Sequence, residues 1–187
     1  MNRLLLIVDP QIDFINGSLP VPGAGAAMDD LAAYVVAHDG QYAAKVVTCD
    51  FHPHNHCSFS INGGQWPEHC VAHSIGAAIW PVLLKSLYST SGRVDIICKG
   101  QCPEVEEDSL FQNRESSKRI ESIVSEMFIE GIDICGLAGD ICVLHTLRDG
   151  VKIFGSEKFH VLQQFSPSID GGDILNQYVQ RLLSCAR

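Results

Sequence analysis

The sequence predicts a three-layer α/β/α protein built on a central, mostly parallel sheet. Five short apolar or alternating runs are bounded by polar residues or glycine, as is typical of strands in such a sheet. These runs span residues 3–8, 45–49, 94–98, 132–136 and 159–163. Segments with helical spacing lie between them. Strands that alternate with helices form βαβ units, so we expect helices on both faces of the sheet.

Four segments have the spacing of helices, and they span residues 26–38, 117–130, 141–149 and 174–183. In the second of these, Ile120, Ile123 and Met127 share one face, which is typical of an amphipathic helix. A chain of 187 residues is within the usual size of one folding unit. We therefore expect a single domain over residues 1–187.

Composition excludes several classes of partner. Hydrophobic residues make up 46% of the chain and charged residues 19%, which is ordinary for a globular protein. The net charge of -9 argues against binding to nucleic acid or to an anionic membrane, since both require clustered Lys and Arg. The apolar run at 4–8 is too short for a signal peptide, and no run is long enough to span a membrane. We expect the protein in the cytoplasm.

The eight cysteines show no Cys-x-x-Cys pair, so neither a zinc ribbon nor a thioredoxin motif is indicated. In the cytoplasm, disulfides are rare. We therefore expect most of these thiols to be small buried hydrophobic groups.

The stretch 52–76 fits neither the period of a helix nor that of a strand, and it is rich in His, Gly, Pro and Ser. A loop of this length inside a compact domain is usually functional. Four potential metal ligands alternate where it begins: Asp50, His52, His54 and His56. They lie on one side of the chain if it stays extended, and His69 adds a further donor. Carboxylate and imidazole together suit Zn²⁺, Mn²⁺ or Fe²⁺. The alternative is a polar surface loop with incidental histidines.

Three chemically active side chains lie at the ends of predicted strands or just beyond them. Asp9 and Lys99 each end an apolar run, and Cys142 lies in a small-residue turn that opens a helix. Unpaired N–H groups at a helix start lower the pKa of a thiol and can hold an oxyanion. Together the three form a plausible base, electrostatic partner and nucleophile. A buried structural role for Cys142 is the alternative.

These residues lie in motifs that resemble the nicotinamidase/pyrazinamidase branch of the isochorismatase-like cysteine hydrolases. The matching pieces are VDPQIDF (8–14), DFHPHNH (50–56), WPEHC (66–70), KG (99–100) and GLAGDICV (136–143). They occur in the family order and cover about the first four-fifths of the chain. Their order makes the match specific as a set.

The resemblance implies a catalytic triad of Asp9, Lys99 and Cys142. In this family the Asp takes the thiol proton, and the thiolate attacks the carboxamide carbon to give a thioester. The resemblance also implies an oxyanion hole formed by the backbone N–H groups of Ala138 and Cys142, with a cis peptide between Leu137 and Ala138. We therefore expect an amidohydrolase that releases a carboxylic acid and ammonia.

The same resemblance implies one divalent metal ion held by Asp50, His52 and His69, with zinc first and manganese or iron as alternatives. His56 and His54 stay open as further ligands. The substrate is expected to be nicotinamide or an analogue such as pyrazinamide, with its ring packed between Phe14 and Trp66.

Alternative functions stay open at this point. The stretch 108–113 (DSLFQN) stands where the family often has an Asp-Ser-Tyr-Ser-Ala-Phe-like sequence, so the pocket wall there differs. One alternative is an enzyme of this family that acts on a different small amide. The other is a catalytically silent relative that binds a metal or ligand. The expected partner is a small molecule, and a homo-oligomer is compatible with the sequence.

Overall fold

The computed structural model describes residues 2–185, of which Cys185 is described without its side chain. Residues 1 and 186–187, and the Cys185 thiol, lie outside the described part. Five parallel strands form one sheet in the order β3-β2-β1-β4-β5. They are β1 (Arg3–Val8), β2 (Tyr42–Asp50), β3 (Arg93–Lys99), β4 (Gly131–Gly136) and β5 (Phe159–Val161). The predicted parallel α/β/α fold is confirmed.

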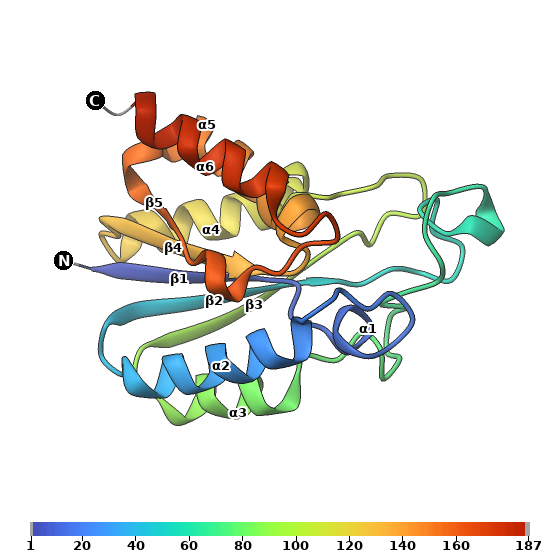
Figure 1. The fold of residues 1–187 in the computed structure, drawn as a ribbon, viewed down its shortest axis with the longest axis horizontal. Helices are drawn as coiled ribbons and strands as arrows, with labels where there is room; N and C mark the ends of the chain where they lie inside the picture. Colours follow the sequence, from blue (N-terminus) through green and yellow to red (C-terminus); the bar gives the residue numbers. More distant parts are fainter. Residues whose placement is uncertain (1, 186–187) are drawn as a thin grey trace.

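Helices cover both faces of the sheet, α2 and α3 on one face and α4, α5 and α6 on the other (Figure 1). The helices are α1 (Ile12–Ile15), α2 (Ala24–Ala37), α3 (Pro81–Ser89), α4 (Arg114–Glu126), α5 (Leu144–Phe154) and α6 (Asp173–Cys185). A π-helical turn at Gly139–Val143 precedes α5, and short 3-10 turns lie at Ser60–Asn62, Leu110–Gln112, Ser156–Lys158 and Gln163–Phe165. In the described part of the chain, no helix combines the length and apolarity needed to cross a bilayer.

The central strand β1 explains the layering, because its side chains alternate between two cores. Leu5 and Ile7 pack on the α2 and α3 side, whereas Leu4 and Leu6 pack on the side of α4, α5 and α6. All four are fully buried. A strand that is buried on both faces has a continuous apolar sequence. The apolar run at 4–8 therefore predicted β1. The single domain over residues 1–187 stays a prediction.

Several helices differ from the prediction. Helix α1 was not predicted, and α5 spans Leu144–Phe154 rather than residues 141–149, since residues 139–143 form a π-helical turn. Helix α3 was not predicted, although Pro81 at its first turn and the apolar pair Leu83 and Leu87 are typical of a helix. Helix α4 starts at Arg114 rather than 117 because the Asn113 side chain caps it by accepting from the Ser116 N–H at 3.0 Å. It ends at Glu126 rather than at 130.

The carboxyl ends of the strands meet at one edge of the sheet, where the longest loops gather (Figure 1). The loop after β2 folds back on itself through bridges between His52 and Val71 and between Phe59 and Trp66. In open parallel sheets this edge is where ligands bind.

We predict that Gly136→Ala destabilises the fold by at least about 2 kcal/mol. Gly136 has φ +127°, and a Cβ there would lie 2.0 Å from the Val8 carbonyl oxygen in the neighbouring strand. Gly25→Ala is the matched control, since its Cβ would meet nothing nearer than 3.9 Å and helical Ala is favoured over Gly. Denaturant unfolding midpoints check this, and equal midpoints for the two variants would contradict it.

Candidate active site

The three predicted catalytic side chains meet at the carboxyl edge of the sheet. Asp9 follows β1, Lys99 ends β3, and Cys142 lies in the π-helical turn after β4. The Lys99 ammonium nitrogen lies 3.0 Å from Asp9 Oδ2 and 3.9 Å from Cys142 Sγ. All three side chains are buried. The fold therefore brings a carboxylate, an ammonium and a thiol together in a site with little water.

Lys99 contacts both other members of this group and links them to residues outside it. Besides Asp9 and Cys142, its ammonium donates to Asp50 Oδ1 at 2.5 Å and to the Glu107 carbonyl at 3.0 Å. Burial opposes its charge, but Asp50 and Asp9 together raise the pKa of Lys99 well above its ordinary value. Lys99 thus stays cationic and can stabilise negative charge on the sulfur.

Asp9 is arranged as a proton acceptor. The Thr48 hydroxyl donates to Asp9 Oδ1 at 2.6 Å, and the Asp9 N–H donates to the Thr48 carbonyl at 3.1 Å. Asp9 Oδ2 has Lys99 nearby but no well-aligned hydrogen bond within the described residues. Burial raises the pKa of Asp9, with Asp50 adding to it and Lys99 and Thr48 opposing it. A raised pKa is favourable for a carboxylate that must take up and return a proton.

The pKa of the Cys142 thiol is not lowered, in contrast to what its position at a helix start predicts. Burial raises its pKa well above the ordinary value; Lys99 opposes this effect, and the charges of Asp9 and Asp50 add to it. The prediction from the helix start alone was wrong because it omitted these surroundings. Cys142 therefore rests as a thiol, and its activation requires the neighbouring base.

The turn around Cys142 presents backbone N–H groups near the sulfur. The expected cis peptide between Leu137 and Ala138 is present. The Ala138 carbonyl accepts from the N–H groups of Ile141 and Val143, both at 3.1 Å. The Ala138 N–H has no backbone acceptor in the part of the chain that the structure describes. It is thus free for an oxyanion, as the resemblance implies.

A second cluster adjoins this group and has the donors of a metal site. Ligand atoms of Asp50, His52 and His69 all lie within 4.8 Å of one another. His52 Nδ1 lies 2.9 Å from the Gly100 carbonyl, and His69 Nδ1 lies 2.8 Å from the Pro67 carbonyl. Each carbonyl requires a proton on Nδ1, which leaves the Nε2 lone pair free.

One orphaned atom tests whether these residues fit a metal ion. His52 Nε2 is buried and has no hydrogen-bond partner among the described residues, and it lies 3.7 Å from Asp50 Oδ2. A buried unpaired acceptor is costly unless a ligand satisfies it. Burial lowers the pKa of His69, so its ring is neutral. Burial lowers the pKa of His52, but Asp50 and the Gly100 carbonyl raise it above its ordinary value, and a metal ion at Nε2 would replace the proton that Asp50 favours there. Two imidazoles and a carboxylate suit a divalent cation.

The remaining histidines of the motif divide into two cases. The segment does not stay extended, because the His56 N–H closes a turn onto the Pro53 carbonyl at 3.0 Å. His54 is consequently exposed at that turn and belongs to no potential metal group. The His56 ring stacks on His52 with centroids 4.0 Å apart, but its nitrogens contact Ser58 Oγ at 2.7 Å and the Val105 carbonyl at 3.1 Å. The condition under which all four donors would share one side, an extended segment, is therefore not met.

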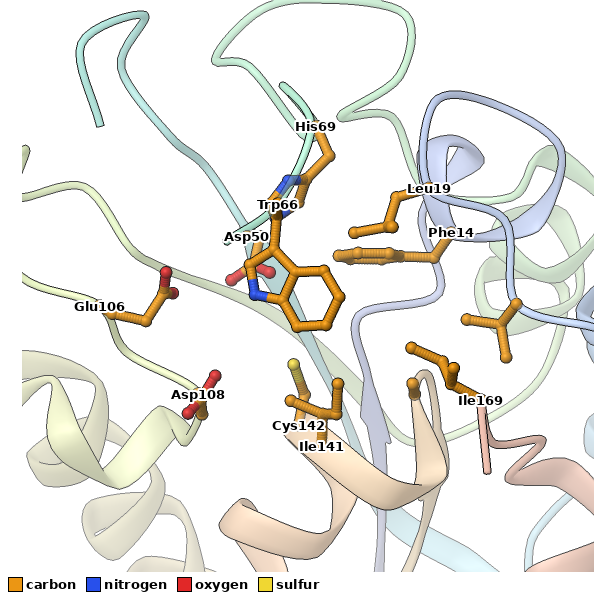
Figure 2. Close-up of a pocket in the computed structure, with 12 residues that line it drawn as sticks. Phe14, Leu19, Asp50, Trp66, His69, Glu106, Asp108, Ile141, Cys142 and Ile169 are labelled. Atoms are coloured by element: carbon orange, nitrogen blue, oxygen red, sulfur yellow. The ribbon is translucent and has the colours of Figure 1, made fainter. Parts of the chain in front are cut away.

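A pocket of about 430 Å³ lies over the sulfur and the metal cluster (Figure 2). Six of its lining residues were predicted as site residues: Phe14, Asp50, Trp66, His69, Ala138 and Cys142. Six were not: Leu19, Val21, Glu106, Asp108, Ile141 and Ile169. Asp9, Lys99 and His52 lie behind this wall. The lining is largely apolar and includes the aromatic side chains of Phe14 and Trp66, which suits an aromatic ring.

Two side chains that the sequence did not single out hold the metal cluster in place. The Gln11 amide accepts from the Asp50 N–H at 2.7 Å and donates to the Asp50 carbonyl at 2.7 Å. Asp13 Oδ2 accepts from the Cys70 N–H at 2.7 Å, next to His69. Asp13 Oδ1 also accepts from the Ser18 N–H at 3.1 Å. The alternation of Asp9, Gln11 and Asp13 was the available signal.

A thiol, a carboxylate and an ammonium at the edge of a parallel sheet, next to histidines suited to a metal, are the groups expected of a metal-binding cysteine hydrolase. No family model matches the chain. The nicotinamidase/pyrazinamidase of Mycobacterium tuberculosis is 33% identical over 155 residues, which cover 80% of this chain and 79% of that protein. The chain belongs to the nicotinamidase/pyrazinamidase family.

Solved structures agree in fold. The pyrazinamidase of Pyrococcus horikoshii in complex with zinc superposes with a TM-score of 0.78 at 28% identity, covering 98% of this chain and 96% of that one. PnC1 from L. infantum in complex with nicotinate gives a TM-score of 0.81 at 27% identity, covering 99% and 90% of the two chains.

We predict that Gly100→Ala weakens metal affinity about 10- to 100-fold, as does loss of a supporting contact to a ligand. Gly100 has φ +67°, and a Cβ there would lie 2.4 Å from His52 Cε1, so the ring must move. Gly63→Ala is the control, because Gly63 also has a positive φ, +91°, but its Cβ meets nothing within 4 Å. Competition with a metal chelator measures the affinity, and equal values for both variants would refute the role of Gly100.

Proposed function

We propose that this protein hydrolyses the carboxamide of nicotinamide, and of analogues such as pyrazinamide, to the carboxylic acid and ammonia. The observation that carries the proposal is Lys99, whose ammonium lies 3.0 Å from Asp9 and 3.9 Å from Cys142 while it also binds Asp50 of the metal cluster. Membership of the family supports the same reaction.

The first half of the reaction forms a thioester. Asp9 takes the proton from the Cys142 thiol, and the thiolate attacks the carboxamide carbon, with Lys99 stabilising the developing thiolate. The N–H groups of Ala138 and Cys142 stabilise the oxyanion. When the C–N bond breaks, Asp9 gives its proton to the leaving nitrogen, and ammonia departs.

The second half releases the acid. Water loses a proton to Asp9 and adds to the thioester carbon, and the C–S bond breaks. The sulfur regains a proton from Asp9 and Cys142 returns to its resting form. Because burial raises the pKa of Asp9, this carboxylate can act as acid and base in turn.

Asp50, His52 and His69 would hold one divalent metal ion, zinc first because two imidazoles and a carboxylate suit it, with manganese or iron as alternatives. When bound there, the ion would supply a Lewis acid for the ring nitrogen of the substrate. His56 would join the site only after leaving the Val105 carbonyl. Phe14 and Trp66 would flank the ring, since both line the pocket.

The predicted cytoplasmic location stays a prediction, which fractionation of cells tests. The absence of nucleic-acid or membrane partners and the oligomeric state likewise stay open to direct measurement, by binding assays and by light scattering.

We predict that Cys142→Ala lowers ammonia release from nicotinamide at least about a thousandfold, because no other group replaces the nucleophile. Its metal content should not change, because Cys142 is not one of the proposed ligands Asp50, His52 and His69. Cys102→Ala is the control, because Cys102 is exposed. The assay covers nicotinamide, pyrazinamide and carbamoyl amines, with and without added Zn²⁺ after chelation. Full activity in Cys142→Ala would show that the mechanism is wrong.

The pH profile tests the role of Asp9. Below its raised pKa the carboxyl is protonated and cannot accept the thiol proton, so kcat/KM falls as pH falls through that value. The Thr48 hydroxyl favours the charged form of Asp9 and lowers its pKa. We predict that Thr48→Val moves the acidic limb of kcat/KM to higher pH, whereas Thr48→Ser leaves it in place. An acidic limb that does not move in Thr48→Val would exclude Asp9 as the group that titrates.

A further inference from the structure

The pocket has an acidic wall, defined by Glu106 and Asp108. Both side chains line the pocket, on the side opposite Phe14 and Leu19, with the Cys142 sulfur between the two sides (Figure 2). The proposed reaction uses neither carboxylate.

The loop that carries the acidic wall is held firmly. The Glu107 carboxylate is buried and accepts from the Gly100 N–H at 2.6 Å and from the Asn113 side chain at 3.1 Å. The Glu107 carbonyl accepts from Lys99 at 3.0 Å. Because the residue between them is fixed at both its side chain and its carbonyl, Glu106 and Asp108 are held at the pocket.

The charges of the acidic wall reach the reacting groups. Burial is the main cause of the raised pKa of Cys142, and the charge of Asp108 adds to it. Burial lowers the pKa of His69, and the charge of Glu106 opposes that effect. Because Glu106 and Asp108 line the same pocket as Cys142 and His69, their charges act on any charged molecule bound in it.

The acidic wall reverses the net charge of the site. With a divalent cation bound, Asp9, Asp50 and Lys99 leave one net positive charge, which would attract a carboxylate. Glu106 and Asp108 add two carboxylates to the pocket, which change this sum to one net negative charge. The substrate amide is neutral, whereas the acid product is an anion.

We propose that Glu106 and Asp108 make the pocket select uncharged carboxamides and expel the anionic acid that hydrolysis produces. This inference rests on the proposed function. The wall limits product inhibition and excludes amides that carry a second, anionic substituent. The selectivity is electrostatic, and salt therefore weakens it.

The test compares the binding of nicotinamide and nicotinate to full-length, zinc-loaded Cys142→Ala protein, which cannot turn over. The variants are Glu106→Gln, Asp108→Asn and the two combined, and Glu104→Gln is the control on the same loop, exposed and outside the pocket lining. His145 Nδ1 lies 3.3 Å from Asp108 Oδ2, so calorimetry compares all variants at the same fixed pH.

The expected result is that the ratio of the nicotinate Kd to the nicotinamide Kd falls about three- to tenfold for each neutralised carboxylate. It should fall further in the double variant, and less at high salt. In the parent enzyme, which has an intact Cys142, Glu106→Gln and Asp108→Asn should each lower the inhibition constant of nicotinate. The ranking of the two variants should match the ranking of their Kd ratios. Glu104→Gln should leave the ratio unchanged.

Two failures are distinguishable. If the parent enzyme releases ammonia from nicotinamide but the ratio stays the same in the double variant, the acidic wall has no such role and only this inference is overturned. If the parent enzyme releases no ammonia and the Cys142→Ala protein binds neither compound, the proposed function fails and this inference fails with it. Unfolding midpoints and zinc content of each variant show that the protein is intact.

Discussion

The buried ammonium of Lys99 is the constraint on which the rest of the site depends. A cation this far from water is strongly unfavourable unless carboxylates compensate it. Asp9 and Asp50 do so, and each belongs to a different part of the chemistry: Asp9 to the nucleophile and Asp50 to the metal cluster. The register of the sheet makes this sharing unavoidable, because Asp50 and Lys99 are direct partners in the β2–β3 pairing. The Lys99 side chain thus contacts both the Asp9–Cys142 pair and the metal cluster.

The sheet and its catalytic edge were predictable from the sequence, because their signals are local. A strand such as Leu4–Val8, buried on both faces, must be apolar throughout, and Asp9 or Lys99 at the end of such a run then stands out. Parallel topology brings strand ends together whatever the loops do. For that reason Asp9, Lys99 and Cys142 could be expected to meet without knowledge of any loop.

The rest depends on contacts between distant residues. His54 alternates with Asp50 and His52, but the turn that closes on Pro53 takes it to the surface. Glu106 and Asp108 line the pocket only because Glu107 binds Gly100 and Asn113, and no periodicity reports such a contact. The pKa of Cys142 depends on burial and on two carboxylates from other strands, which a reading of its own turn cannot include. In contrast, Pro81 was a local signal for α3 that could have been used.

The segment from Asp9 to Asp13 spaces the two halves of the site. Its alternate side chains have separate tasks: Asp9 contacts Lys99, Gln11 pairs with both backbone groups of Asp50, and Asp13 binds the N–H next to His69. These five consecutive residues therefore fix the distance between Asp9 and the metal cluster. Insertion or deletion of a single residue within this segment would displace all of these contacts together. Replacement of one side chain would disturb only the contact that this side chain makes. Evolution of a new substrate range in this scaffold is consequently free to remodel the pocket walls but has little freedom to change the length of this segment.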